Sequence, residues 1–362
     1  MQERVPERRQ ISPFMALFVI VAMQTGMGIL SFQQLIAKDA GYDAWLSVIG
    51  AGLTVHLLVW MMYKICEAVD GDLMSAHVFL FGKVIGNSIS TLFIFYFSVN
   101  CITTLGSLIE VIRTWMFPSL NSFWFASVYL LLGIYIVNGG FRTVVGISFF
   151  GLLIPSYLLL SFIYPIKYGD VTNLLPIFDH TPMELIRSAY YMAPTFFGYG
   201  ILMFFYPFIK KPQESKKWVH VGVLTSTFIN TGLAIISFIY FPPGLLQRSI
   251  WPTLEMWKIV SLPFVERFEY LGIANWTLVI VSNVAIALWC ASRIAKRVYK
   301  ITQRKAVLIV AIMCLLFVLQ VDTSERMKII FHINTKIGIV AAYIYTPLIY
   351  LLMLIKQKVK AK

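Results

Sequence analysis

The chain has 362 residues, of which 59% are hydrophobic and only 13% carry a charge. Soluble proteins have about 25% charged residues, so this composition excludes an ordinary soluble domain and indicates a protein embedded in a membrane. The formal net charge of +13 needs no nucleic-acid partner, because basic cytoplasmic loops and contact with anionic lipid explain it.

Ten uncharged, apolar runs follow one another along the chain. A run of about 18 or more such residues predicts a membrane-spanning helix. In chain order the runs are Phe14–Ala37, Ala44–Tyr63, Val84–Ile109, Thr114–Phe141, Thr143–Ile166, Ser188–Ile209, Val221–Gln247, Tyr270–Ser292, Ala306–Val321 and Ile337–Ile355. The first is too long for a removable signal peptide, and the ninth is the shortest. The sequence therefore predicts a single transmembrane domain, 1–362, with about ten all-α spans.

The distribution of Lys and Arg predicts the orientation. With the N-terminus in the cytoplasm, 20 of the 30 basic residues fall on the cytoplasmic side. An even number of spans then brings both termini to that side, so a multi-pass protein with both termini cytoplasmic is expected.

Ten spans divide into two sets of five, 13–166 and 183–356. Because five is odd, the second set enters the membrane from the opposite side, which is the inverted repeat of many secondary transporters. In that LeuT-like arrangement the first helix of each set, helix 1 and helix 6 overall, is broken near the midplane and binds substrate there.

A G-x-G interruption lies at each of the two corresponding places. Helix 1 contains Gly26-Met27-Gly28, and helix 6 contains Gly198-Tyr199-Gly200 four residues after Pro194. Glycine allows the backbone to leave helical geometry and a ligand to approach it. Close packing of helices is the alternative explanation. The matched positions favour two breaks, whereas a nucleotide-binding loop is disfavoured because no strand precedes either motif.

Polar side chains within the spans supply further candidates. Asn100 in helix 3 and Asn283 in helix 8 could face a central cavity, or could form hydrogen bonds between helices. No Asp, Glu, Lys or Arg lies well inside a span, which argues against a simple proton-driven pump. His56 in helix 2 is interpreted as a packed imidazole. At the start of helix 8, Glu266, Arg267 and Glu269 form an acid–base cluster with an expected gating or structural role.

No catalytic or metal-binding motif is present. The sequence lacks G-x-S-x-G, HExxH and P-loop patterns, its five histidines are dispersed, and its four cysteines include no CxxC pair. We therefore expect neither an enzyme nor a bound metal or cofactor.

Several motifs resemble those of the spore germination permease family, the B subunits of spore germinant receptors, within the amino acid–polyamine–organocation transporter superfamily. They are Gly26-Met27-Gly28, Asn138-Gly139-Gly140, Asn173-Leu174-Leu175-Pro176, Phe197-Gly198, Ile250-Trp251-Pro252-Thr253 and Glu266-Arg267-Phe268-Glu269. The chain departs from the family at Phe32-Gln33, where a Leu-Pro pair is frequent, and at Gly200, where some members have glutamate.

The resemblance implies a subunit that senses a small nutrient germinant, often an amino acid. It implies partnership with an A subunit and a lipoprotein C subunit in the inner membrane of the spore. By the same resemblance the ligand pocket is lined by Thr25, Gly26, Met27, Gly28, Phe197, Gly198, Tyr199 and Gly200. An amino acid permease of the same superfamily is the alternative function, and a scaffold subunit that binds no ligand is a third.

Overall fold

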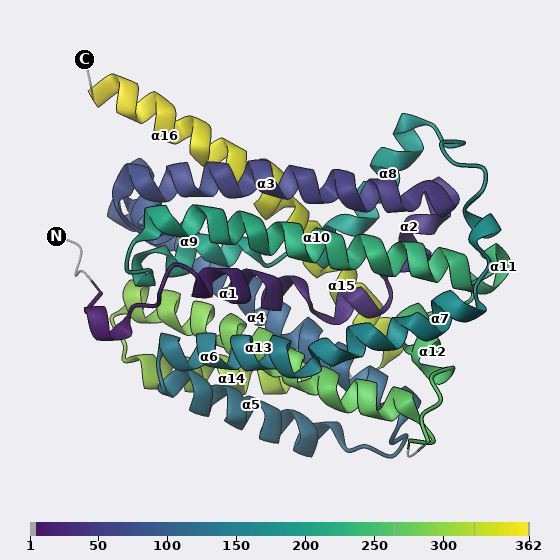
Figure 1. Cartoon of the computed structure of the whole chain (residues 1–362). Coiled ribbons are helices and arrows are strands. Elements are labelled where there is room, and N and C mark those ends of the chain that lie inside the picture. Colours follow the sequence, from purple (N-terminus) through teal and green to yellow (C-terminus); the bar gives the residue numbers. More distant parts are fainter. Residues whose placement is uncertain (1–4, 264, 322, 361–362) are drawn as a thin grey trace.

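A computed structural model describes residues 5–263, 265–321 and 323–360, so both ends of the predicted 1–362 domain lie outside it. The regular structure of these ranges is helical, and two isolated β-bridges add to it, Ile11 with Ile209 and Leu262 with Val265. Most of the helices run along one common direction, and both ends of the drawn chain lie at the same end of the bundle (Figure 1). We call this the termini end, and the opposite one the far end.

Among the described residues, seven α-helices form the first part of the chain. They are α1 (Met15–Gln24), α2 (Phe32–Ala40), α3 (Ala44–Val69), α4 (Leu73–Trp115), α5 (Ser122–Asn138), α6 (Phe141–Leu153) and α7 (Ile163–Tyr168). A 3-10 segment, Ile154–Phe162, joins α6 to α7. Pro155 near its start lacks the N–H that a continuous α-helix requires, which explains the change of helix type.

Nine helices form the second part. They are α8 (Pro182–Phe196), α9 (Leu202–Phe205), α10 (Ser215–Tyr240), α11 (Pro243–Leu246), α12 (Pro252–Lys258), α13 (Phe268–Tyr299), α14 (Gln303–Gln320), α15 (Ser324–Ile339) and α16 (Thr346–Lys360). A π-helical segment, Val340–Tyr345, joins α15 to α16. Such segments often occur at functional sites.

The all-helical membrane fold is confirmed. Seven helical segments of the described ranges are long and apolar enough to cross a membrane, and three shorter apolar segments accompany them, Met15–Gln24, Ser122–Asn138 and Tyr199–Phe208. The ten predicted spans, numbered helix 1 to helix 10, correspond to α1–α2, α3, α4, α5, α6–α7, α8–α9, α10, α13, α14 and α15–α16. The ninth, the shortest, coincides with α14, which has 18 residues.

Several predicted helix ends were wrong. The fourth run was placed from Thr114, but α4 continues to Trp115 and α5 begins at Ser122, where the Asn121 side chain caps it. The seventh run was extended to Gln247, whereas α10 ends at Tyr240 because two prolines follow. The tenth helix begins at Ser324, capped by Thr323, well before Ile337.

The third span contains a break that the sequence analysis missed. Gly82 adopts φ 78° and ψ 174°, so a short helix of residues 73–81 is set off from the rest of α4. Lys356 of α16 donates hydrogen bonds from Nζ to the carbonyl oxygens of Phe79 (2.6 Å) and Leu80 (3.0 Å). A basic group there satisfies carbonyls that the break leaves without an intrahelical partner.

Helix α13 lies at the centre of the scaffold. It packs against α4, α5, α6 and α14 and also contacts α1. Asn283 in the middle of α13 lies beside Gly26 at the break in helix 1. Arg293 and Arg297 lie in its last turns, at the termini end. The position of α13 thus decides the geometry of two of the sites described below.

Candidate functional site

Helix 1 is broken at the predicted place. α1 ends at Gln24, Thr25 and Gly26 leave helical geometry (φ −107°, ψ 55° and φ −96°, ψ −156°), and a 3-10 turn, Met27–Leu30, leads into α2. The Thr25 hydroxyl donates to the carbonyl of Val21 (2.6 Å), which caps the last turn of α1.

Helix 6 is broken at the predicted place as well. α8 ends at Phe196, two residues after Pro194, and Gly198 adopts φ 118° and ψ −26°. L-amino acids with a side chain rarely adopt this conformation, so a glycine is required here. A 3-10 turn, Tyr199–Ile201, then continues into α9.

The two breaks touch each other. The Gln24 side chain donates from Nε2 to the carbonyl oxygen of Phe196 (3.1 Å), which is the last residue of α8. A Cβ atom on Gly198 would lie 2.6 Å from Cβ of Met23, and one on Gly28 would lie 3.1 Å from Oγ1 of Thr195. The glycines therefore allow the two interrupted backbones to pack closely.

A small central cavity of about 40 Å³ adjoins these breaks. Among the predicted site residues, Asn100, Phe197, Gly198, Tyr199 and Gly200 line it. Its other walls come from α1, α3, α4, α9 and the π-helical segment Val340–Tyr345. Their aromatic and methionine side chains are Met23, Met62, Phe93, Tyr96, Phe97, Met203, Phe204 and Tyr345. Ligand pockets usually have about 300–1,000 Å³, so this cavity must widen before it can hold a ligand.

The polar groups of this cavity are few. The Tyr199 side chain is 2% exposed, and its hydroxyl has no hydrogen-bond partner among the described residues. Asn100 donates a long hydrogen bond, 3.5 Å from Nδ2 to the Tyr96 carbonyl, and its side chain also hydrogen bonds with the Tyr96 hydroxyl. The Tyr199 hydroxyl thus retains capacity to bind a ligand.

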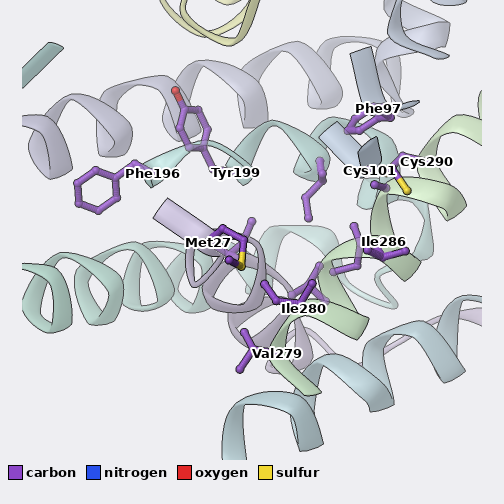
Figure 2. Packing of buried hydrophobic residues seen from close by; sticks show 14 of the residues in the cluster. Met27, Phe97, Cys101, Phe196, Tyr199, Val279, Ile280, Ile286 and Cys290 are labelled. Atoms are coloured by element: carbon purple, nitrogen blue, oxygen red, sulfur yellow. The ribbon is translucent and has the colours of Figure 1, made fainter. Parts of the chain in front are cut away.

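The other predicted ligand residues lie elsewhere. Met27 is buried in the core that also contains Tyr199 and Ile280 (Figure 2). A Cβ on Gly26 would meet Oδ1 of Asn283 at 3.8 Å, and Asn283 donates its own Nδ2 to Val279 (3.1 Å). Thr25 faces a second, lateral cavity. The structure therefore divides the predicted set between the central cavity and the packing around it.

Two further predicted features can be placed. The His56 ring is hydrogen bonded, with its Nδ1 2.8 Å from Nδ1 of His220 on α10.

At the far end, Arg267 donates from Nε to Oε1 of Glu269 (2.9 Å) and covers the ring of Tyr270, whereas Glu266 is exposed. Glu269 is only 5% exposed and lies in the first turn of α13, where the helix dipole favours an anion.

Replacing Glu269 is expected to impair the protein more than replacing Lys358, which lies on the exposed last turns of α16. Glu269→Ala removes a buried carboxylate at a helix start, worth about 1–3 kcal/mol, whereas Lys358→Ala should stay within about 0.5 kcal/mol. Thermal unfolding in detergent measures the difference, and equal midpoints for the two variants would contradict the structural role of Glu269.

A buried ion cluster at the termini end was missed by the sequence analysis. Asp72 is fully buried and accepts hydrogen bonds from the backbone N–H (3.0 Å) and hydroxyl (2.7 Å) of Ser75, at the start of the 73–81 helix. Arg293 donates to it from Nη2 (3.1 Å), and Arg297 contacts both of its oxygens. No local sequence pattern pairs these residues, because Asp72 is 221 positions from Arg293 and 225 from Arg297.

The two arginines and the Ser75 hydrogen bonds keep the Asp72 carboxyl ionised. Burial raises the pKa of the Asp72 carboxyl, but Arg297, Arg293 and the hydrogen bonds from Ser75 outweigh it and hold the pKa below its ordinary value. The Arg293 guanidinium also lies over the ring of Phe208, 4.4 Å from its centroid, where helix 6 ends. The cluster therefore ties α13 to the 73–81 helix and to helix 6.

The 73–81 helix also contacts the central cavity through His77. Ser90 donates its hydroxyl to the Gly86 carbonyl (2.8 Å), so it accepts from Nδ1 of the fully buried His77 (2.8 Å). Nε2 of His77 is then the acceptor for the hydroxyl of Tyr345. Because Tyr345 lines the cavity and ends the π-helical segment, the cavity wall is linked directly to the termini end.

At the far end, Asp43 holds the connection before α8 in place. Its carboxylate, 2% exposed, accepts from the backbone N–H groups of Phe178 (2.9 Å), Asp179 (2.8 Å) and His180 (3.3 Å) and lies 3.0 Å from Nδ1 of His180. These bonds join the turn between helices 1 and 2 to the start of helix 6.

We expect Asp43→Ala to free this connection. Hydrogen bonds to a charged group are worth about 1.5–3 kcal/mol, which corresponds to roughly 10–150-fold faster amide exchange at residues 178–180. Hydrogen–deuterium exchange with mass spectrometry measures this. Asp170→Ala is the control, since Asp170 caps Thr172 in the same connection, and equal exchange in the two variants would argue against the role of Asp43.

Comparisons with known proteins agree with this architecture. A family model described as spore germination protein matches residues 10–327. The chain is 39% identical over 361 residues to spore germination protein GerQB of Bacillus cereus, covering 99% of both chains. It is 23% identical over 276 residues to spore germination protein B2 of Bacillus subtilis (strain 168), covering 72% of each.

Two solved structures share the fold. MhsT in complex with L-phenylalanine has a TM-score of 0.64 at 14% identity, covering 95% of this chain and 88% of that one. A Na⁺-coupled sialic acid symporter in a substrate-bound, outward-open state has a TM-score of 0.64 at 12% identity, covering 93% and 80%. At these identities the likeness concerns the fold alone.

Proposed function

Since the chain belongs to the spore germination protein family and is a homologue of germinant-receptor B subunits with the LeuT fold, we propose that it senses a small germinant in its central cavity. The observation that carries this proposal is the contact between the two helix breaks beside the cavity. A ligand that binds there alters the packing of helices 1 and 6 directly.

An amino acid is the ligand class that the site favours. α1 and α8 both end at the breaks, and the carbonyl ends of helices carry partial negative charge that favours an ammonium group. The cavity walls offer aromatic and thioether surface and no charged side chain. An uncharged amino acid side chain suits such a surface, and the cavity must widen to admit it.

The proposal can be tested by measuring the unfolding temperature of the purified chain with each of a panel of amino acids. A ligand that binds only the folded state raises stability by about 2.7 kcal/mol at 100 times its Kd. We expect at least one amino acid to raise the unfolding temperature of the wild-type chain, and no response to any of them would count against an amino acid ligand.

Gly200→Leu is expected to abolish that thermal response. The nearest atom to a Cβ on Gly200 is Cε of Met62 at 4.0 Å, so a larger side chain enters the cavity without striking the backbone. Gly146→Leu is the matched control, because Gly146 lies in α6 and a Cβ there meets nothing within 4 Å. A scaffold subunit without a ligand site predicts no difference between these variants.

The alternative function is amino acid transport, which the LeuT fold also serves. A receptor needs a ligand that shifts two states strongly, by about 10⁴-fold in relative affinity for a near-complete switch. A transporter must instead change state with and without cargo. Uptake of radiolabelled amino acids into proteoliposomes separates the two, because saturable flux by the isolated chain contradicts a pure receptor.

Partners and location complete the proposal. We expect the chain to act with an A subunit and a lipoprotein C subunit in the inner membrane of the spore, with the termini end toward the cytoplasm. The division into two five-helix repeats, 13–166 and 183–356, stays a prediction, which the helix breaks near the start of each repeat support. Co-purification from spores tests the partnership, and protease access to a C-terminal tag in oriented vesicles tests the orientation.

A further inference from the structure

A second cavity lies beside the break in helix 1, outside the proposed germinant site. It has a volume of about 290 Å³, compared with about 40 Å³ for the central cavity. Val21, Thr25 and Ile29 of helix 1 form its floor, and helices 5, 7 and 8 and the loop helix α12 form its walls. In this conformation it is the larger of the two spaces.

The walls of this lateral cavity are mostly hydrocarbon. Four hydroxyl side chains line it, and each already donates to a backbone carbonyl: Thr25 to Val21 (2.6 Å), Ser156 to Leu153 (2.7 Å), Thr225 to Val221 (2.9 Å) and Thr253 to Ile29 (2.9 Å). No charged side chain is among the lining residues. Trp257 and Trp276 also line the cavity, and their indole N–H groups are buried without a partner among the described residues. Indole groups only donate, so a zwitterion such as an amino acid would find no carboxylate there to pair with its ammonium group.

The position of the mouth indicates what fills it. Leu153 and Leu159, which line the cavity from helix 5, are 52% and 46% exposed in the middle of a membrane-spanning segment. The medium at that depth is lipid hydrocarbon, which matches the apolar walls. The 3-10 segment Ile154–Phe162 forms this side of the mouth.

We propose that the lateral cavity binds an acyl chain of a membrane lipid, which packs against the break in helix 1. The Thr253 hydroxyl, which donates to Ile29 and accepts from Nε2 of Gln33 (2.7 Å), fixes the part of helix 1 after the break to α12 at the wall of the cavity. An acyl chain completes the support of this break on the side facing helix 5. The proposal is independent of the identity of the germinant.

Photolabelling tests the proposal. The chain is reconstituted in vesicles that contain phosphatidylglycerol with a diazirine near the end of one acyl chain, irradiated, and mapped by mass spectrometry. We expect label on peptides with Trp257 and Val279, cavity residues that are each only 1% exposed, in addition to Phe228, which is 79% exposed on α10. Label confined to outward-facing residues such as Phe228 overturns the proposal.

Two variants fill the mouth from opposite sides. Ser156→Phe on helix 5 and Thr225→Phe on helix 7 are expected to remove the label from Trp257 and Val279 and to leave the label on Phe228 unchanged. Persistent label at the buried residues in both variants would contradict the proposal. So would competition by millimolar free amino acids, which would mean that the cavity takes a soluble ligand.

A second test measures the quenching of tryptophan fluorescence by lipid. Brominated acyl chains quench nearby tryptophans, so vesicles of dibrominated phosphatidylcholine should quench the wild-type chain more than Trp257→Phe. Equal fractional quenching of the two would show that acyl chains do not reach Trp257, and the proposal would then fail.

Discussion

Gly198→Ala is expected to destabilise the folded chain by about 2–6 kcal/mol and to abolish its response to germinant. At φ 118° a residue with a side chain costs about 1–3 kcal/mol of backbone strain. The new methyl group would also lie 2.6 Å from Cβ and 2.9 Å from the carbonyl oxygen of Met23, and overpacking of this kind costs about 1–3 kcal/mol more. Relief of this overlap requires helix 1 to move away from helix 6.

Thermal unfolding of the purified variant and germination of spores that carry it are the measurements. Gly146→Ala is the control, since a Cβ at this helical position meets nothing within 4 Å. That change should be neutral or stabilise slightly, because alanine favours a helix by up to about 1 kcal/mol over glycine. Equal stability and equal germination for the two variants would falsify the role given to the contact between the breaks.

Asp72→Ala is expected to lower stability by about 3–5 kcal/mol. The change leaves Arg293 and Arg297 without the carboxylate that they share, and breaking a buried ion pair from one side has this order of cost. It also removes the cap from the 73–81 helix. Glu214→Ala breaks an exposed pair with Lys211 and should cost no more than about 1 kcal/mol.

The conservative variant separates charge from shape. Asp72→Asn can still cap the 73–81 helix but leaves the arginines unpaired, so it should fall between wild type and Asp72→Ala. Because the folded-state pKa of Asp72 is lowered, its stabilisation is present above the unfolded pKa of about 3.9 and is lost as the pH falls through the folded-state value. Unfolding midpoints near pH 7 therefore measure the full effect. A midpoint for Asp72→Ala equal to that of Glu214→Ala would contradict it.

The membrane fold and both helix breaks could be predicted from the sequence, because apolar length and glycine position are local properties. The helix ends were harder to place. Runs of uncharged residues do not distinguish a helix from an apolar connection, and caps such as Asn121 and Thr323 decide the ends instead.

Contacts between distant segments could not be predicted. Asp72 and Arg297 are 225 positions apart, and no local pattern in the sequence pairs them. His77 gains its role only because the π-helical segment Val340–Tyr345 brings Tyr345 to it. The division of the predicted ligand residues has the same origin. The family resemblance implies that Gly26 and Gly28 line one pocket with Gly200, but the local turns direct them to Asn283 and Thr195 instead of the central cavity.

The central claim is that a small germinant binds beside the contact between the two breaks. The most direct test is ligand protection of Gly200→Cys, labelled with a small methanethiosulfonate reagent in nanodiscs. The four native cysteines are buried and should react slowly. We predict that at least one amino acid slows labelling at Gly200→Cys but not at Ser119→Cys, an exposed far-end control. Unchanged rates at Gly200→Cys with every amino acid, or equal protection at both positions, would contradict this account.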